Sequence, residues 1–160
     1  MENKSAFITN DKAKQLKQRI DEGKQEICRR CGELLDGGWH CSEAMLVGVG
    51  GLLAPLHPQV LKVATGFAGG VGESHEELCG ALSGGILVIG LLYGRAEAQG
   101  ADGKCEQLCA EYRRRFREEF GWVVCRELKA NWVGRPGQER CVQLVEKAAG
   151  ILLALLGEEG

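Results

Sequence analysis

Apolar residues recur every three or four positions along most of the chain, which is the spacing of amphipathic helices. The first such stripe consists of Ala13, Leu16, Ile20, Ile27, Cys31 and Leu34. It predicts a long helix that ends at Gly37 and Gly38. A second helix is expected from near His40 to Leu52, and a short third helix around residues 60–64. No segment alternates apolar and polar residues over a useful strand length.

The second half of the chain continues the helical pattern. We expect a helix to start near Ser74, because Ser74 and Glu77 have the spacing of a capping box and carboxylates favour a first helical turn. This helix continues through the apolar segment 78–94, where small residues four positions apart allow another backbone to approach closely. Further helical stripes cover residues 105–120, 125–132 and 141–155.

These elements predict an all-α fold. We expect a compact helical bundle with a glycine-rich central helix and a glycine-rich loop at residues 66–72. The length of 160 residues suits one domain spanning residues 1–160, and residues 1–10 are expected to be flexible.

Composition and charge exclude several classes of function. The chain has 20 Lys and Arg against 22 Asp and Glu, and its net charge is −2, so it has no basic field for nucleic acid or a membrane surface. The basic run at 113–117 is followed by Glu118 and Glu119 and is expected to be a solvated helix face. We expect no signal peptide before the first helix, since residues 1–20 contain no apolar core segment, and segment 78–94 is short for a membrane span. We therefore expect a cytoplasmic protein.

Eight of the residues are cysteines. In a reducing compartment this number indicates metal or redox chemistry rather than structural disulfides. Cys28 and Cys31 form C-x-x-C, and Cys105 and Cys109 form C-x-x-x-C, so each pair shares one face of a helix. Together the two pairs could supply a four-cysteine site for zinc or an iron–sulfur cluster. Buried cysteines that pack as small apolar residues are the alternative.

Four further cysteines are isolated in the sequence and can still meet in the core of a helical bundle. They are Cys41, Cys79, Cys125 and Cys141. Cys41 and Cys79 are expected in or near first helical turns, where the helix dipole favours a thiolate. His40 and His75 are close in sequence to these two cysteines, and each is a candidate to tune a thiolate or to serve as a mixed ligand.

The glycine-rich segment does not match a nucleotide-binding motif. We expect Gly70, Gly72 and Gly80 to contribute to a cofactor site instead. Glycine lets the backbone come close to the cysteines, and amide N–H groups can hydrogen-bond the sulfur atoms of a cluster.

The four isolated cysteines also carry a family resemblance. The landmarks are the segments 39–44 (WHCSEA), 69–72 (GGVG), 79–84 (CGALSG), 91–94 (LLYG) and 120–128 (FGWVVCREL), followed by Cys141. On these landmarks the chain resembles the C_GCAxxG_C_C family of redox-active proteins, although Leu78 stands before Cys79 where the family pattern has glycine. The family is distantly similar to split-Soret cytochrome-type proteins. Here Gly32 follows Cys31, so the C-x-x-C-H haem motif is missing.

The resemblance implies a redox role that depends on the four cysteines. We expect an iron–sulfur cluster of undefined type, bound by these four cysteines, and electron transfer with a redox partner protein. Cys28, Cys31, Cys105 and Cys109 are expected to form a second metal site or to extend the first. A thiol–disulfide oxidoreductase with Cys79 as nucleophile and a non-catalytic module with structural zinc, or no cofactor at all, are the alternatives. The close-packing glycines also allow a homodimer.

Overall fold

The structure is a computed structural model that describes residues 10–52, 56–136 and 140–159. In chain order its elements are α1 (Asn10–Asp36), α2 (Cys41–Met45), the π-helical turn η1 (Leu46–Gly50), α3 (Pro58–Thr65), α4 (Gly80–Tyr93), α5 (Gly103–Phe120), α6 (Cys125–Leu128), the π-helical turn η2 (Lys129–Val133) and α7 (Val142–Gly157). The described residues contain no strand, and the one β-bridge among them joins Leu78 and Val124. The expected all-α fold is confirmed. The expected flexibility of residues 1–10 falls on residues 1–9, outside the described part.

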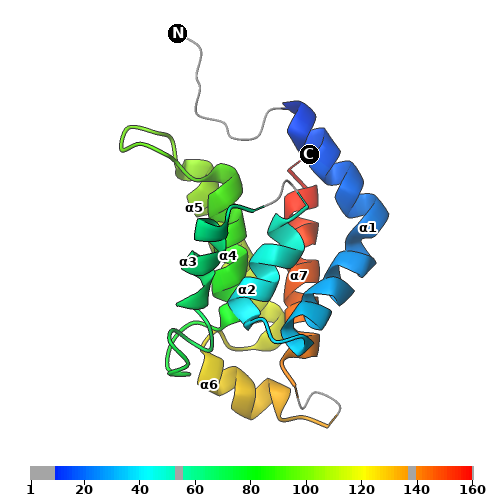
Figure 1. The fold of residues 1–160 in the computed structure, drawn as a ribbon, viewed down its shortest axis with the longest axis vertical. Coiled ribbons are helices and arrows are strands. Elements are labelled where there is room, and N and C mark those ends of the chain that lie inside the picture. The colour runs from blue at the N-terminus through cyan, green and yellow to red at the C-terminus, as the bar shows by residue number, and fades with distance from the viewer. Residues whose placement is uncertain (1–9, 53–55, 137–139, 160) are drawn as a thin grey trace.

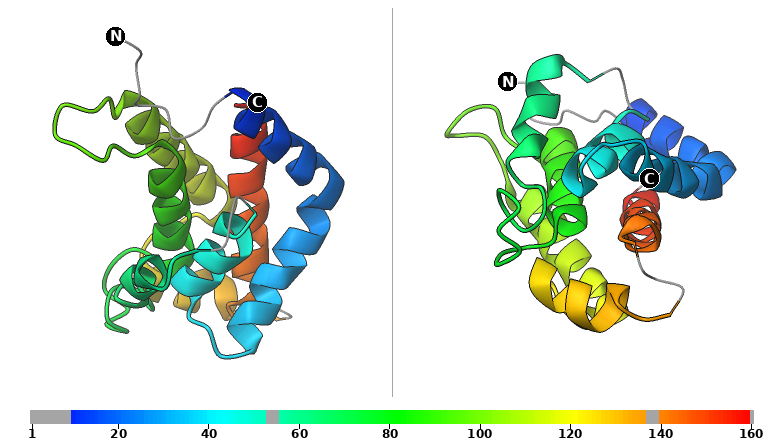
Figure 2. Two further views of the ribbon diagram at one scale, coloured as in Figure 1. Left: turned by 45° about the horizontal axis from the view of Figure 1, so that its top comes forward. Right: turned by 60° about the horizontal axis from the view of Figure 1, so that its bottom comes forward.

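The long first helix packs along the last one. α1 and α7 lie side by side in Figures 1 and 2, and their packing is the most extensive between any two helices. Leu16, Ile20 and Ile27 of the predicted stripe are buried, as an amphipathic helix on a core requires. α1 ends at Asp36, directly before the two glycines expected to stop it.

α4 is the central helix, in contact with α2, α5 and α7. Its glycines permit these contacts, as predicted. A Cβ on Gly84 would lie 2.6 Å from the Ser42 carbonyl oxygen, and a Cβ on Gly85 would overlap the ring of Tyr112 on α5. The Tyr112 hydroxyl lies within hydrogen-bond distance of the carbonyl oxygens of Ala81 and Ala148, and thereby links α5 to α4 and α7.

The predicted start of this helix near Ser74 is wrong. α4 begins at Gly80 with Cys79 as its N-cap, and the preceding segment is held in an open conformation. His75 has a φ of +62°, outside the right-handed helical region, and the Leu78 bridge to Val124 takes the backbone into an extended pairing. Ser74 Oγ accepts the N–H of Glu76 in a local turn and caps no helix.

Two helices expected as regular α-helices change their winding after one turn. α2 continues as η1, and α6 continues as η2. π-helical turns occur often at functional sites. Here each of them follows a short helix that begins with a cysteine.

The basic run that was expected to be a solvated helix face carries ion pairs. Arg114 pairs with Glu111 and Glu118 on α5, and Arg115 joins Glu111 to Glu158 at the end of α7. In the part of the chain that the structure describes, no helix combines the length and apolar character that a membrane crossing needs.

Candidate functional site

The four isolated cysteines all stand at the starts of helices. Cys41 is the first residue of α2 and Cys125 the first of α6. Cys79 is the N-cap of α4 and Cys141 the N-cap of α7. Figure 1 shows the starts of these four helices gathered at one end of the molecule, at the bottom of the view. Helix N-termini carry partial positive charge, so this arrangement favours negative charge on the sulfur atoms.

The four thiols form one electrostatic neighbourhood. Cys79 interacts with the other three, Cys125 also interacts with Cys41 and Cys141, and Cys141 interacts with Cys41. The thiols of every pair among the four therefore interact electrostatically, although residues 42–140 lie between Cys41 and Cys141 in the sequence. We call these residues the four-cysteine site.

Burial dominates the acidity of the site. It raises the pKa of Cys41 and Cys79, and it raises the pKa of Cys125 to about 11. Backbone N–H groups act in the opposite direction, since those of Gly69 and Ser42 donate to Cys41 and that of Ala81 donates to Cys79. The site thus directs donors at buried sulfur, while burial holds the thiols protonated at neutral pH.

Two of the three predicted glycines line the site. A Cβ on Gly80 would overlap Cys41 Sγ, and a Cβ on Gly70 would lie 2.8 Å from Cys125 Cβ. Gly70 also has a φ of +75°, a conformation that favours glycine. A Cβ on Gly72 would meet no atom within 4 Å, so this glycine serves the left-handed turn, with a φ of +59°.

Backbone hydrogen bonds join the segments that carry Cys79 and Cys125. The N–H of Cys79 donates to the Val123 carbonyl at 2.8 Å, and the N–H of Cys125 donates to the Glu77 carbonyl at 2.9 Å. These bonds flank the bridge between Leu78 and Val124. The two cysteines are therefore aligned by a short antiparallel pairing that apolar periodicity did not predict.

The two histidines have different neighbours from those suggested by sequence proximity. His75 lies beside Cys125, with 3.4 Å between Nδ1 and Sγ, rather than beside Cys79. The partner of His40 is Glu73, at 3.2 Å from Nδ1. The close approach of His75 to Cys125 depends on the left-handed loop, which is why spacing along the chain did not reveal it.

α2 is fixed by two polar side chains that the sequence analysis did not single out. The buried Ser42 hydroxyl donates to the Ala64 carbonyl at 2.7 Å. Glu43 accepts the His40 N–H at 2.8 Å and the Thr65 hydroxyl at 2.6 Å. These bonds attach α2 to α3 and so hold Cys41 in place.

The two helical cysteine pairs lie apart from each other. Cys28 and Cys31 are on α1, and Cys105 and Cys109 are on α5, which Figures 1 and 2 show on opposite sides of α7. The electrostatic interactions of Cys109 and Cys31 with other cysteines are those within each pair. Cys31 is fully buried against Gly48 of η1. The structure does not bring the two pairs into one four-cysteine set.

No single-ion geometry is present. Within residues 10–52, 56–136 and 140–159, no group of three or more His, Cys, Asp or Glu side chains could hold one metal ion. An iron–sulfur cluster places sulfide and several irons between its thiolates, so its ligands stand farther apart than those of one ion. Four thiols with backbone donors and glycine clearances are the kind of ligand set that such a cluster takes.

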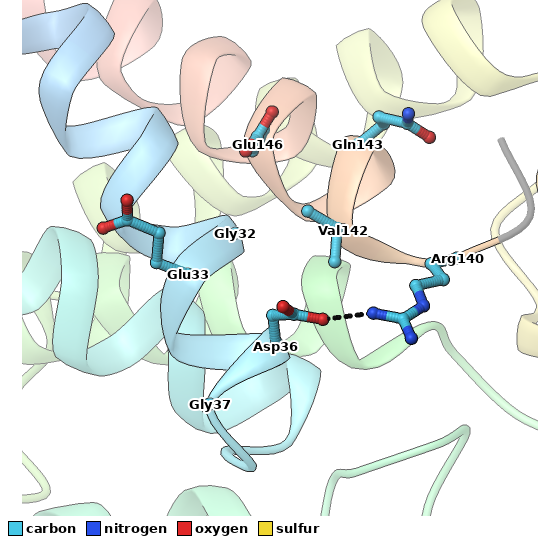
Figure 3. Close-up of a pocket in the computed structure, with 8 residues that line it drawn as sticks. All are labelled: Gly32, Glu33, Asp36, Gly37, Arg140, Val142, Gln143 and Glu146. Atoms are coloured by element: carbon cyan, nitrogen blue, oxygen red, sulfur yellow. Dashed lines mark hydrogen bonds and ion pairs between the residues drawn. The ribbon is translucent and has the colours of Figure 1, made fainter. Parts of the chain in front are cut away.

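An open cavity of about 550 Å³ lies between α1 and α7, next to Cys141 in the sequence but distinct from the four-cysteine site. An ion pair between Asp36 and Arg140 crosses it, and Figure 3 shows the carboxylates of Glu33 and Glu146 pointing in different directions. The polar groups of this cavity do not converge on one ligand position.

Comparison with known proteins identifies one family. Comparisons with curated proteins and with solved structures found no match. The family described as "Putative redox-active protein (C_GCAxxG_C_C)" matches residues 39–155, a range that contains the four-cysteine site and excludes Cys28 and Cys31. With four cysteines of that range coupled at one end of the bundle, the chain belongs to the C_GCAxxG_C_C family of redox-active proteins.

Proposed function

We propose that the four-cysteine site binds an iron–sulfur cluster and that the protein transfers electrons between partner proteins. The convergence of four thiols at four helix starts is the observation that carries this proposal. Four thiolates with a cluster have net negative charge, which the helix N-termini and the backbone donors of Gly69 and Ala81 stabilise. When bound, the cluster supplies a reversible one-electron change.

The residues of the chain have separate tasks in this proposal. Cys41, Cys79, Cys125 and Cys141 are the ligands. Gly80 leaves room for Cys41 Sγ, and Gly70 leaves room for Cys125 Cβ. The partial burial of the site keeps water away and, with the N–H donors, sets the reduction potential. All eight cysteines are free thiols, which agrees with a reducing compartment such as the cytoplasm.

The burial of Cys79 weighs against a thiol–disulfide oxidoreductase. An attacking thiol works as its thiolate, whereas burial raises the pKa of Cys79 and its side chain is only 6% exposed. Metal binding removes this obstacle, because the metal displaces the proton of each thiol.

The proposal is tested by purifying the protein without oxygen and measuring visible absorption, iron and acid-labile sulfide. We expect a brown protein that bleaches on reduction. Replacing any of the four cysteines by serine should remove most of the signal, while the matched double variant Cys105→Ala/Cys109→Ala should keep it. A zinc-loaded colourless protein would refute the cluster, and a colourless metal-free protein with reactive thiols would favour the oxidoreductase.

A further inference from the structure

A second sulfur site lies on α5, away from the four-cysteine site. Cys105 and Cys109 occupy the first two turns of this 18-residue helix, which begins after an exposed loop. Both side chains are partly exposed, and they lie one turn apart on the same face of the helix. We propose that Cys105 and Cys109 form an independent two-thiolate site for one soft monovalent cation of the Cu(I) type.

The helix geometry favours a bridging ion over a disulfide. Side chains four positions apart on a helix have Cβ atoms about 5–6 Å apart, whereas a disulfide requires about 3.5–4.5 Å. Oxidation would therefore distort the first turns of α5. A metal ion between the two sulfurs lengthens the connection and leaves the helix regular.

The number of donors selects the kind of ion. Zinc in a structural site takes four ligands, and among the described residues no third His, Cys, Asp or Glu completes a group with this pair. Cu(I) prefers soft thiolates and is satisfied by two of them. Cys105 is the third residue of α5, where the helix dipole stabilises the single negative charge of a Cu(I) bis-thiolate.

The binding step is balanced without any change of oxidation state. Two S–H bonds break, two Cu–S bonds form, and two protons pass to water. Burial, followed by the neighbouring Cys105, raises the pKa of Cys109 to about 12. Because each thiol gives up its proton to bind the ion, binding becomes stronger as the pH rises.

The α1 pair provides the matched control. Cys28 and Cys31 are also one turn apart, but Cys31 is fully buried against Gly48. An ion between those two sulfurs would have to displace packed core. We therefore assign the site to the α5 pair alone.

The test is an anaerobic Cu(I) titration of the full chain against a chromophoric Cu(I) chelator. Wild type should bind one more high-affinity equivalent than Cys105→Ala/Cys109→Ala, and the single variant Cys105→Ala should also lose it. The control Cys28→Ala/Cys31→Ala should keep it. Equal stoichiometry in wild type and the Cys105/Cys109 double variant would overturn the proposal.

A measurement on the unmodified chain makes the result independent of variant folding. Saturating Cu(I) should slow alkylation of both Cys105 and Cys109 at least tenfold, quantified by peptide mass spectrometry, while Zn²⁺ should not. Alkylation at an unchanged rate would also overturn the site. Neither result depends on whether the four-cysteine site holds iron.

Discussion

At the scale of single residues, Gly80 controls the space around Cys41. Its missing side chain leaves the volume that Cys41 Sγ occupies, and Ser42 N lies 3.2 Å from where a Cβ would stand. The first turn of α4 and the first turn of α2 are thus in direct contact through a glycine and a ligand candidate.

Replacing Gly80 by alanine should therefore damage the site. The methyl group would push Cys41 aside, and overpacking of this kind costs about 1–3 kcal/mol of unfolding free energy. Denaturant unfolding and the iron content of the purified protein measure the two effects. Gly90→Ala on the same helix is the control, because its Cβ would meet nothing within 4 Å, and it should stabilise by about 0.5–1 kcal/mol. Equal stability of the two variants would contradict this account.

The Tyr112 hydroxyl is a second residue-scale feature with a measurable effect. The ring is fully buried, and its hydroxyl lies 3.2 Å from the Ala81 oxygen and 3.3 Å from the Ala148 oxygen. Tyr112→Phe should reduce the free energy of unfolding by about 0.5–1.5 kcal/mol, the net value of one hydrogen bond. Tyr93→Phe is the control at a half-buried tyrosine. A stability unchanged from wild type would show that the bond contributes nothing.

At the scale of elements, α5 and α7 are joined by a charge network at the surface. Arg115 bonds to Glu111 on its own helix and to Glu158 at the end of α7. The Arg114 and Arg115 guanidinium groups lower the pKa of Glu111 to about 2. Arg115 also lowers the pKa of Glu158.

This network predicts an acid-dependent loss of stability. A carboxylate with a depressed folded-state pKa contributes stability above its unfolded pKa of 4.5, and this contribution disappears as the pH falls toward 2. The melting temperature of wild type should therefore drop more between pH 4.5 and 2 than that of Glu111→Gln. Glu97→Gln, in the exposed loop before α5, should follow wild type. Parallel curves for wild type and Glu111→Gln would be the contrary result.

Apolar periodicity predicted the elements that are buried on one face. α1, α5 and α7 lie where their stripes placed them, because amphipathic spacing and core burial have the same physical cause. It failed at residues 74–79. His75 in this segment, and Val71 and Glu73 just before it, have left-handed φ angles although none is glycine. Tertiary contacts hold those angles, so local pattern cannot reveal them.

The candidate site was predictable in its members and not in its geometry. The family resemblance singled out the four isolated cysteines, whereas spacing alone also left a site at the two helical pairs open. His75 contacts Cys125, which is 50 positions later in the chain. Leu78 pairs with Val124 between the same two segments. No local signal reports such contacts.

At the scale of the whole molecule, the four-cysteine site brings together four segments that lie far apart in the sequence. Its residues come from α2, α4, α6 and α7. A group bound to all four would bind the folded state and not the unfolded chain, and would stabilise the fold accordingly.

If the four-cysteine site binds the proposed cluster, removing its iron should lower the melting temperature of the whole protein. We expect a decrease of about 5–15 °C when a chelator strips the anaerobically purified protein, on the basis of ligand linkage and the size of the domain. Calorimetry of loaded and stripped protein measures it. Cys41→Ser should melt at the same temperature with and without chelator. If the loaded and stripped wild type melt together, the site does not hold the fold together.

The packing of α1 along α7 has a consequence for synthesis of the chain. The ribosome makes α1 first, and residues 37–141 must follow before the first residue of α7 exists. Until then the apolar stripe of Leu16, Ile20 and Ile27 lacks the surface that covers it. Exposed apolar stripes are the surfaces by which nascent chains associate or meet chaperones. Cys141 emerges just before α7, so the last cysteine of the four-cysteine site and the cover of the first helix arrive together.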